Sequence, residues 1–316
     1  MIVFGPIPSR RLGRSLGINN IPHKHCTYSC IYCQLGHTNA LTTIRMEYIP
    51  PDELFTAVKT RVDELRSAGE KIDYLTFVAD GEPTLDIHLG ASIKKLKKLG
   101  IKIAVITNSS LLMSESVRRD LTFADWVSLK IDSAIPSVWE KINRPHGLLE
   151  LKNIFEDIME FVVAYKGELM TETMLVKGVN DSLQSIRATA GAIRMINPRK
   201  AFILVPTRPP VESYVAPADW SALAAAYQIF GEHSIEAELL THDEGNEFTY
   251  SSDVEKELMN ILSVHPMQKD AVKKFLSRSN TGWEVIEKLI QGDRLKEVVY
   301  DRHTFIVRTY FNKPHP

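Results

Sequence analysis

An apolar face that recurs every three or four residues marks the first helix of the chain, over residues 50–68. Leu54, Val58, Val62 and Leu65 occupy that face, and the segment opens with two acidic side chains, which suit the first turn of a helix. The pattern therefore predicts an amphipathic helix that packs its apolar side against a core.

Short apolar runs with strand character alternate with further helical patterns downstream. The expected strands cover residues 16–20, 74–78, 101–107, 126–131, 170–176 and 201–205, and the further helices cover residues 86–99, 114–121, 148–165, 182–195 and 217–230. Such repeats imply parallel strands with helices outside, closed wholly or partly into a barrel whose working residues sit at the C-terminal strand ends. We therefore expect an α/β fold of this kind.

Residues 5–17 break the alternation. The segment holds too many glycines and prolines for a helix and too many arginines for a core strand, so we expect a loop. Guanidinium forks suit carboxylates and phosphates. Arg10 and Arg11 are therefore candidates for binding a ligand's anionic group, although a solvated arm without ligand contact would show the same composition.

The pattern changes again near Gly245. Three helical segments and two short strands follow, over residues 252–262, 268–276, 281–289, 297–300 and 304–310, with Asp301 and Arg302 at the tip between the strands. Three helices and a β-hairpin in so short a stretch resemble a winged helix. We therefore expect two domains, at residues 1–247 and 248–316.

The charge of the second expected domain is modest. Its 11 basic side chains minus 9 acidic ones give +2, with Lys269, Lys273, Lys274 and Arg278 grouped around its second helix. Winged helices often bind nucleic acid, but many are docking modules, so both roles stay open.

The whole chain is nearly neutral, with 38 Lys and Arg against 39 Asp and Glu. It therefore has no overall basic field that would attract nucleic acid, and any such contact needs a local patch. The N-terminus lacks a basic-then-apolar leader, and no apolar run is long enough to span a membrane. We expect a cytoplasmic protein without membrane contact.

All three cysteines lie in one short segment, as Cys26, Cys30 and Cys33. Thiolates suit soft metals and iron–sulfur clusters, and three of them can hold three irons of a cubane cluster while the fourth iron keeps an open position. The alternatives are a disulfide with a spare thiol, or a zinc site whose fourth ligand would be His25 or His37. Disulfides are unusual in a chain of this size with so few cysteines, so we expect a cluster.

The Cys-x3-Cys-x2-Cys spacing, with Tyr32 directly before the last cysteine, resembles the signature of the radical S-adenosylmethionine (SAM) superfamily. The resemblance implies a [4Fe-4S] cluster on the three cysteines and SAM chelated to the open iron. Reductive cleavage of SAM would release a 5′-deoxyadenosyl radical, which abstracts hydrogen from a substrate. The resemblance also implies a partial (β/α)6 TIM-like barrel, and it places the backbone at Tyr32 beside the adenine.

Asp80, Gly81 and Glu82 precede Pro83 after the second expected strand. Glycine permits a tight turn and proline removes an amide donor, so carbonyls and a carboxylate face outward, as a bound ammonium group requires. The stretch resembles the Gly-Gly-Glu motif of radical SAM proteins, with Asp80 in place of the first glycine, where it holds the methionyl amine. A plain turn is the alternative.

Polar side chains also close the next two strands. Asn108 is expected either to hydrogen-bond a ribose or carboxylate of the cofactor or to cap the next helix. Ser128, Lys130 and Asp132 alternate with apolar residues, so they should point into the lumen of a parallel barrel. Lys130 and Asp132 could form a structural ion pair there, but a buried pair is a poor stability device, which favours binding of SAM ribose and substrate.

Lys177 ends the fifth expected strand. An amine in a semi-desolvated lumen has a lowered pKa and becomes nucleophilic toward carbonyls, which makes Lys177 a candidate catalytic residue beside Lys130; an exposed lysine at a turn is the alternative. The stretch Leu175-Val176-Lys177-Gly178 resembles wyosine-forming radical SAM enzymes and their short relatives, in which a lysine is thought to hold pyruvate as a Schiff base.

The same relatives share the opening Gly-Pro-x-Pro-Ser-Arg-Arg-Leu-Gly, Asn143-Arg144-Pro145 and Arg208-Pro209-Pro210. The rigid segment at Arg208 suits an adenine shelf or a barrel rim, and Arg208 is a further candidate for substrate contact. Wyosine enzymes carry additional cysteines for a second cluster, and this chain has none. The resemblance is therefore closest to short single-cluster relatives.

We accordingly expect a radical SAM oxidoreductase or transferase that takes electrons from a flavodoxin or ferredoxin. The resemblance makes tRNA the first expected substrate, with a protein or small metabolite as the alternative. The rival class is an iron–sulfur redox-sensing regulator that acts through the winged helix, which leaves the turn at Asp80 and the lumen residue Lys130 unexplained. A ferredoxin-like carrier would normally complete its ligand set with a fourth cysteine.

Overall fold

A computed structural model of the protein describes residues 2–241 and 254–309. Its main element is an eight-stranded sheet with the order β1-β2-β5-β6-β7-β8-β9-β10, in which β1 runs antiparallel to β2 and the later neighbours pair in parallel. The strands are β1 (Val3–Ser9), β2 (Gly13–Ile18), β5 (Tyr74–Phe77), β6 (Lys102–Thr107), β7 (Trp126–Lys130), β8 (Glu168–Met174), β9 (Lys200–Leu204) and β10 (Ala237–Leu240).

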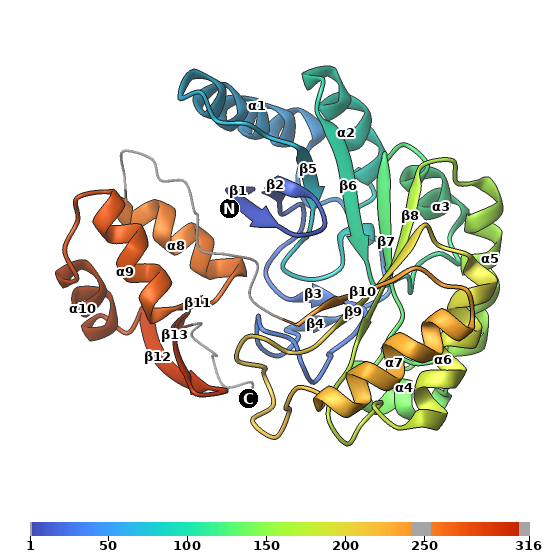
Figure 1. Ribbon diagram of the computed structural model, residues 1–316. Helices are drawn as coiled ribbons and strands as arrows, with labels where there is room; N and C mark the ends of the chain where they lie inside the picture. The colour runs from blue at the N-terminus through green and yellow to red at the C-terminus, as the bar shows by residue number, and fades with distance from the viewer. Residues whose placement is uncertain (1, 242–253, 310–316) are drawn as a thin grey trace.

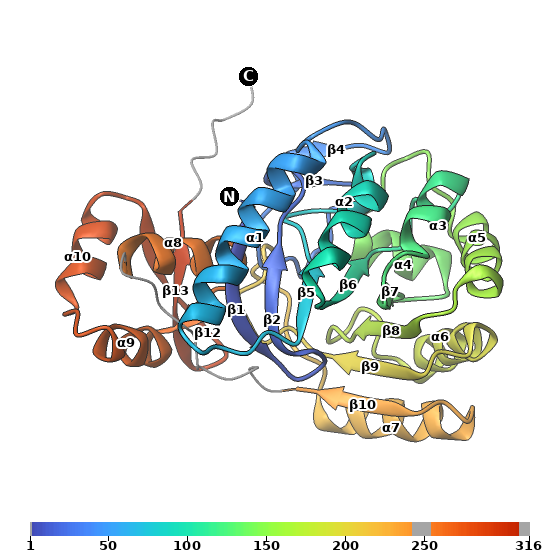
Figure 2. The same cartoon turned by 90° about the horizontal axis from the view of Figure 1, so that it is seen from above.

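Helices follow the parallel strands and cover the outer face of the sheet, which curls into an open half-barrel (Figures 1 and 2). They are α1 (Pro51–Ser67), α2 (Leu89–Leu96), α3 (Glu115–Leu121), α4 (Pro136–Asn143), α5 (Leu151–Ala164), α6 (Leu183–Ile196) and α7 (Trp220–Glu232). Shorter elements are β3 (His25–Cys26), β4 (Ala40–Leu41) and the 3-10 turns η1 (Pro83–Leu85) and η2 (Lys97–Leu99). The α/β class and the partial barrel expected from the sequence are confirmed.

Apolar side chains fill both faces of the sheet. On the outer face, the stripe of α1 predicted from Leu54, Val58, Val62 and Leu65 is buried in the main core, which confirms the helical pattern. The inner face carries a second apolar cluster made from the strands and the β1–β2 turn: Leu12, Ala104, Trp126, Met170, Phe202 and Leu240.

The expected loop over residues 5–17 is wrong, because Val3–Ser9 form the strand β1 and pair with β2. Prolines lack a backbone donor, which strand edges tolerate, and β1 lies at the edge of the sheet. The pairing shifts register between Phe4 and Ile7, around Gly5, whose φ is +90°. Arg10 and Arg11 therefore belong to the tight connection between β1 and β2, at the end of the sheet where β2 begins.

Other differences concern short elements. The helix expected over residues 86–99 begins only at Leu89 and ends, through η2, at Gly100 with a φ of +71°. The pattern did not predict α4 or β10, whose eight and four residues are too short to show a clear period. None of the described helices is long and apolar enough to cross a membrane.

After the undescribed residues 242–253, a C-terminal unit begins with α8 (Val254–Val264). It continues with β11 (Met267–Gln268), α9 (Lys269–Arg278), α10 (Glu284–Gln291), β12 (Leu295–Tyr300) and β13 (His303–Arg308), and its sheet has the order β11-β13-β12. The three helices and the hairpin expected there are present, with positive φ at Asp301 and Arg302 in the turn. Residues 252, 253 and 310 of the expected elements, and the expected boundary at 247, lie outside the described residues.

The C-terminal unit has its own apolar cluster and lies beside β1 (Figure 2). Ile7 of β1 packs against that cluster, and Arg61 of α1 forms an ion pair with Glu257 of α8 at 3.1 Å. The Tyr300 hydroxyl donates to the carbonyl of Pro206 over 3.0 Å. The unit thus covers the β1 side of the half-barrel, while its winged-helix character and its status as a separate domain stay predictions.

Candidate functional site

The segment from His25 to Cys33, here called the cysteine loop, lies at the mouth of the half-barrel. Its start pairs with β4 as the short strand β3, and its backbone is held by three other segments, at residues 142–146, at Glu82 and at Val211. The amides of Ser29 and Ile31 donate to the carbonyls of Asn143 and Ile142, each at 3.0 Å. The amides of Glu82, His146 and Val211 donate to the carbonyls of His25, Thr27 and Cys33 at 3.0, 2.9 and 3.0 Å.

Each cysteine sulfur faces one side-chain N–H donor. The distances are 3.7 Å from Asn108 Nδ2 to Cys26 Sγ, 3.3 Å from Asn143 Nδ2 to Cys30 Sγ and 3.0 Å from Lys24 Nζ to Cys33 Sγ. All three thiols are free and half-buried. Donors directed at sulfur stabilise thiolates and tune a bound cluster.

The charge state of the loop follows from its burial. Burial raises the pKa of the Cys30 thiol to about 11 and raises that of Cys26 further. Burial alone would lower the pKa of the Lys24 ammonium, but the neighbouring thiols raise it above its ordinary value. The sequence analysis missed Lys24; its position two residues before the first cysteine was the available signal.

The donor set fits an iron–sulfur cluster in its chemistry, because three thiols share one loop and a bound cluster favours their deprotonated form. Among residues 2–241 and 254–309, no three His, Cys, Asp or Glu side chains are grouped as ligands of a single metal ion. The fit therefore rests on the kind of ligand and on the N–H donors around it.

The turn after β5 packs directly under the cysteine loop. A Cβ at Gly81 would lie 1.8 Å from the carbonyl oxygen of His25, so only glycine fits there. The buried Glu82 carboxylate accepts hydrogen bonds from Thr84, Thr107 and the Asn108 amide, the last at 2.7 Å. Glu82 thus ties the turn to the end of β6, although burial raises its pKa.

The Asp80 carboxylate is the group in this turn that a bound hydrogen-bond donor would stabilise most. The residue is 6 % exposed, and within the described part of the chain Oδ1 has no hydrogen-bond partner, while Oδ2 lies 3.4 Å from His23 Nδ1. The Asp80 amide donates to Asn19 at 3.0 Å and its carbonyl accepts from Lys24 at 2.7 Å. A buried carboxylate oxygen without a donor is costly, and a bound ammonium group would satisfy it.

Asn108 joins the end of β6 to the cysteine loop. Its side-chain Nδ2 donates to the Thr27 hydroxyl at 2.7 Å, and its Oδ1 accepts from the backbone N–H of Ser110 at 3.1 Å. Asn108 does not precede α3 directly, since that helix starts at Glu115. The residue therefore positions the cysteine loop, and its contact with a cofactor stays a prediction.

Asp132 is the centre of a second buried group. Its carboxylate accepts from the Tyr32 hydroxyl, from Asn143 Nδ2 at 2.7 Å and from the Met174 amide at 2.8 Å. Asn143 thus bridges Asp132 and Cys30. The sequence analysis quoted the motif of Asn143 without a role for it, and the structure brings this side chain to the cysteine loop.

Lys130 lies on the inner face of β7, as expected. Its Nζ is 4.0 Å from Asp132 Oδ1 and 5.1 Å from the centre of the Tyr32 ring. Glu172, its partner in register on β8, was missed by the sequence analysis. Met170, Glu172 and Met174 are two residues apart and so share one face of β8, and this spacing was the sequence signal for an inward carboxylate at Glu172.

Glu172 links the lumen to the β1–β2 turn. Its Oε1 accepts from Ser128 Oγ at 2.9 Å and lies 2.6 Å from Arg11 Nη1, which confirms that Ser128 faces inward. Burial acts to raise the pKa of Glu172, but Arg11, Lys130 and Ser128 together hold it below its ordinary value. Arg11 is therefore fixed in the lumen by a buried ion pair.

Lys177 is not in a semi-desolvated lumen, so that expectation is wrong. β8 ends at Met174, and the Lys177 side chain lies beyond the rim, 53 % exposed and 2.9 Å from Asp219 before α7. An amine becomes nucleophilic toward carbonyls when it is desolvated, and an exposed ion pair leaves the lysine amine in contact with water. The alternative of an exposed lysine at a turn describes this position.

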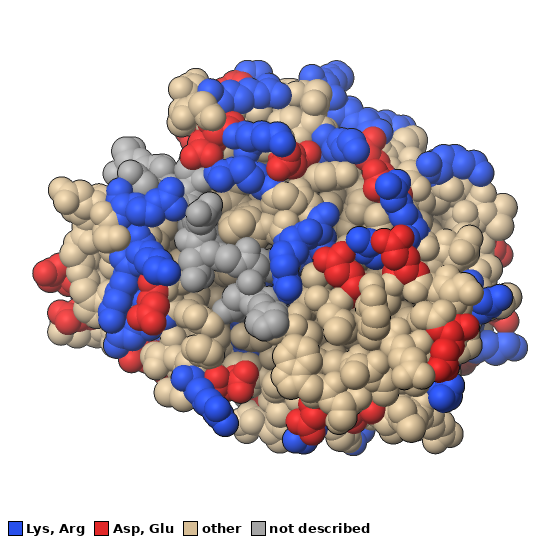
Figure 3. Space-filling model, in the orientation of Figure 1, with Lys and Arg blue, Asp and Glu red and all other residues tan. Residues whose placement is uncertain are grey.

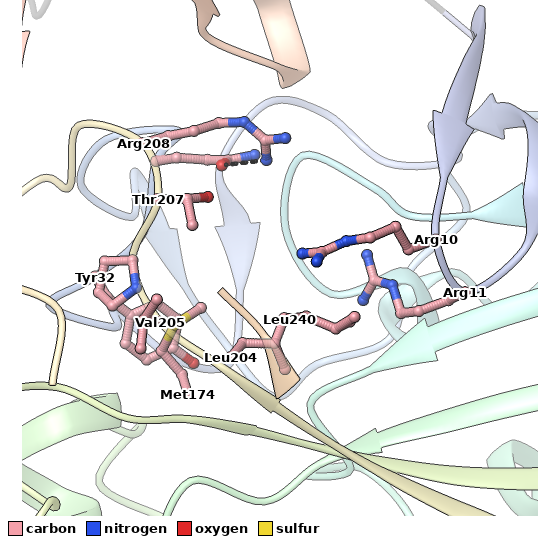
Figure 4. Close-up of a pocket in the computed structure, with 11 residues that line it drawn as sticks. Arg10, Arg11, Tyr32, Met174, Leu204, Val205, Thr207, Arg208 and Leu240 are labelled. Atoms are coloured by element: carbon pink, nitrogen blue, oxygen red, sulfur yellow. Dashed lines mark hydrogen bonds between the residues drawn. The ribbon is translucent and has the colours of Figure 1, made fainter. Parts of the chain in front are cut away.

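Arg10, Arg11 and Arg208 line one pocket beside the cysteine loop (Figure 4). Tyr32 and Met174 also line it, on the side of Arg208 and across from Arg10 and Arg11. Arg208 donates to Gln34 Oε1 at 3.2 Å and contacts His265 Nε2 of the C-terminal unit at 3.1 Å. The structure thus brings together the three arginines that the sequence analysis singled out separately.

Comparison with known proteins agrees with this geometry. A model of the radical SAM superfamily matches residues 20–189. A UPF0026 protein of Methanocaldococcus jannaschii is 44 % identical over 309 residues, which cover 97 % of this chain and 96 % of the relative. A UPF0026 protein of Helicobacter pylori is 35 % identical over 219 residues, 68 % of this chain and 69 % of the relative.

Among solved structures, a radical SAM methyltransferase from Sphaerobacter thermophilus is similar with a TM-score of 0.55. The sequence identity is 14 %, and the match covers 72 % of this chain and 66 % of that chain. At this identity the similarity concerns the fold alone, and it agrees with the curled parallel sheet described above.

Proposed function

The chain belongs to the radical SAM superfamily and is an enzyme, and on that premise we propose that Cys26, Cys30 and Cys33 hold a [4Fe-4S] cluster that cleaves SAM reductively. When bound, the cluster and SAM supply a 5′-deoxyadenosyl radical that abstracts hydrogen from a substrate. The observation that carries the proposal is the cysteine loop at the barrel mouth, with one N–H donor directed at each sulfur. A flavodoxin or ferredoxin would be the electron donor.

Different residues around the cysteine loop would bind different parts of SAM. Asp80 Oδ1, buried and without a donor in the described residues, would accept the methionyl ammonium, with the backbone at Gly81 beside it. Glu82, which already accepts four hydrogen bonds, would hold this turn in shape rather than touch SAM. The backbone at Tyr32 would support the adenine, and Lys130, half-buried on the inner face, would reach the ribose or substrate.

The test is anaerobic reconstitution with iron and sulfide, followed by chromatography for 5′-deoxyadenosine under strong reduction. We expect about four irons per chain, from the cluster type, and formation of 5′-deoxyadenosine that is lost in Cys30→Ser. Asp80→Asn should weaken SAM binding while cluster content stays normal, because Asp80 donates no ligand to iron. A reconstituted protein that binds iron but never cleaves SAM would contradict the proposal.

A redox-sensing regulator is the second candidate, and the buried constellation of Asp80, Lys130 and Glu172 argues against it. A sensor needs a cluster and an output surface, but it has no use for charged side chains ordered in a barrel lumen. DNA binding that changes with cluster oxidation, without SAM cleavage, would favour the sensor.

For the substrate, tRNA is the candidate that the resemblance to wyosine-forming enzymes suggests. Basic and acidic side chains are mixed over the face shown in Figure 3, with a run of basic ones along the C-terminal unit. On α9, Lys269 and Lys273 have the acidic partners Glu297 and Asp270, while Lys274 and Arg278 are exposed. RNA binding with a steep salt dependence would support this substrate.

A further inference from the structure

We propose that the pocket between Arg10 and Arg208 binds the anionic group, a phosphate or a carboxylate, of a small-molecule substrate. The inference rests on the proposed function, because it places this substrate beside the SAM site. The substrate class is a small molecule with an anionic group, bound in a part of the site that the cysteine loop does not occupy.

The arginines reach the pocket from opposite ends of the half-barrel. Arg10 and Arg11 belong to the connection that precedes β2, whereas Arg208 follows the C-terminal end of β9. Figure 4 shows Arg208 entering the pocket from one side and Arg10 and Arg11 from the other. Three guanidinium groups from two distant segments therefore converge on one cavity.

The three arginines differ in what holds them. Arg11 is committed to Glu172 at 2.6 Å, so its charge is offset within the lumen. Arg208 is held by Gln34 and His265, and burial together with the Arg208 charge lowers the pKa of His265 well below its ordinary value, which leaves that imidazole neutral. The guanidinium groups of Arg10 and Arg208 thus border the cavity with forked donors suited to anionic oxygens.

Apolar side chains line one part of the pocket. Met174, Leu204 and Leu240 line it, next to the Tyr32 ring. A ligand with an anionic head and an apolar or planar body fits this pocket, because its head meets the arginines while its body packs against the apolar side chains. Tyr32 and Gln34 flank Cys33, so the body of this ligand would lie next to the cysteine loop.

The C-terminal unit limits how large the ligand can be. His265 lines the neighbouring pocket that shares Arg11, Gln34 and Arg208 with this one, and Tyr300 bonds the carbonyl of Pro206 at its rim. Since these contacts close the β1 side of the lumen, a compact molecule fits the pocket better than a folded RNA does.

The test is isothermal titration of the full chain, reconstituted without oxygen and saturated with SAM. The probes are AMP for phosphate and malonate for carboxylate, with adenosine as the neutral match of AMP. We expect AMP or malonate to bind and adenosine to bind much more weakly. Arg10→Gln and Arg208→Gln should each weaken binding of the anion about tenfold or more, the effect of a lost charge-assisted hydrogen bond.

Arg199→Gln is the matched control, because Arg199 precedes β9 at the end opposite to Arg208, pairs with Glu168 and does not line the pocket. It should leave binding unchanged. If Arg208→Gln lowers the melting temperature, Arg10→Gln still tests the proposal, since Arg10 is exposed and its loss leaves the core intact.

Four outcomes would overturn the inference: no binding of AMP or malonate at millimolar concentration, equal binding of adenosine and AMP, affinity unaffected by both arginine changes, or binding of tRNA alone. Much tighter binding of the anion to protein without SAM than to the SAM-saturated protein would also overturn it, because the pocket would then be part of the SAM site. Measuring 5′-deoxyadenosine on the same preparation separates these failures from a failure of the proposed function.

Discussion

Lys24 Nζ donates a hydrogen bond to Cys33 Sγ across 3.0 Å, although the lysine side chain is only 3 % exposed. The residue has a φ of +59°, and its backbone is fixed by bonds to Asp80 and to Asn39 and Ala40. A buried cation held this firmly beside Cys33 would favour the more negative, reduced state of the cluster proposed there.

We therefore expect Lys24→Met to lower the reduction potential of the reconstituted cluster by on the order of 60 mV, a tenfold change in a one-electron equilibrium. A redox titration followed by electron paramagnetic resonance measures this shift without any turnover. Lys152→Met on α5 serves as control, since that lysine is exposed. An unchanged potential in Lys24→Met would show that this ammonium does not tune the cluster.

Gly81→Ala should destabilise the protein by several kcal/mol and abolish cluster binding, because the added Cβ would meet the His25 carbonyl at 1.8 Å. Denaturant unfolding and iron content measure the two effects. Gly191→Ala on α6 is the matched change, as its Cβ meets nothing within 4 Å, and it should stabilise the helix by about 0.5–1 kcal/mol. Equal stability of the two variants would contradict the close approach.

Asn143→Ala should reduce cluster retention and cost about 1–3 kcal/mol of stability, since it leaves the Asp132 carboxylate without one of its donors and removes the contact to Cys30. Iron and sulfide content after gel filtration, together with urea unfolding, would check this. Asn153→Ala, on the exposed side of α5, should change neither quantity. Full cluster retention in Asn143→Ala would mean that the backbone bonds alone hold the loop.

His265 should make stability depend on pH. Its pKa is lowered by burial and by Arg208, so between that value and about 6.5 the unfolded chain binds a proton that the folded chain does not. The free energy of unfolding should therefore fall as pH drops below about 6.5, by up to 1.4 kcal/mol per pH unit from this group.

Urea unfolding at pH 7 and pH 5.5 measures the effect. In His265→Gln the loss of stability between these values should be smaller by about 1 kcal/mol. His303→Gln, at an exposed position in β13, should behave like the unchanged protein. If His265→Gln lost as much stability as the unchanged protein, protonation of His265 would play no part.

The sequence predicted the structural features that depend on residues close together in the chain. The apolar stripe of α1, the β-then-α alternation and the cysteine spacing are all periodic or contiguous, so each is visible in a short window. The same reasoning failed for β1, where edge position overrides the poor strand propensity of Gly5, Pro6 and Pro8.

The side chains that complete the site escaped prediction because their partners are distant in sequence. Asn143 meets Cys30 across 113 positions, and Arg11 meets Glu172 across the whole lumen. Lys177 was misplaced for a different reason, since its strand ends two residues earlier than expected and leaves Lys177 beyond the strand end. Polar residues at a strand end predict a site, but the exact residue at which the strand ends decides which side chains lie in that site.

The bonds that hold the cysteine loop also bear on the maturation of the enzyme. They come from Glu82, Asn108, Asn143 and Val211, so a growing polypeptide exposes its thiols long before it has synthesised the residues that arrange them. Iron delivered early would meet a disordered chelator open to oxidation. Loading of the proposed cluster with iron and sulfide should therefore follow folding of the barrel, so that iron meets a finished apoprotein rather than a nascent chain.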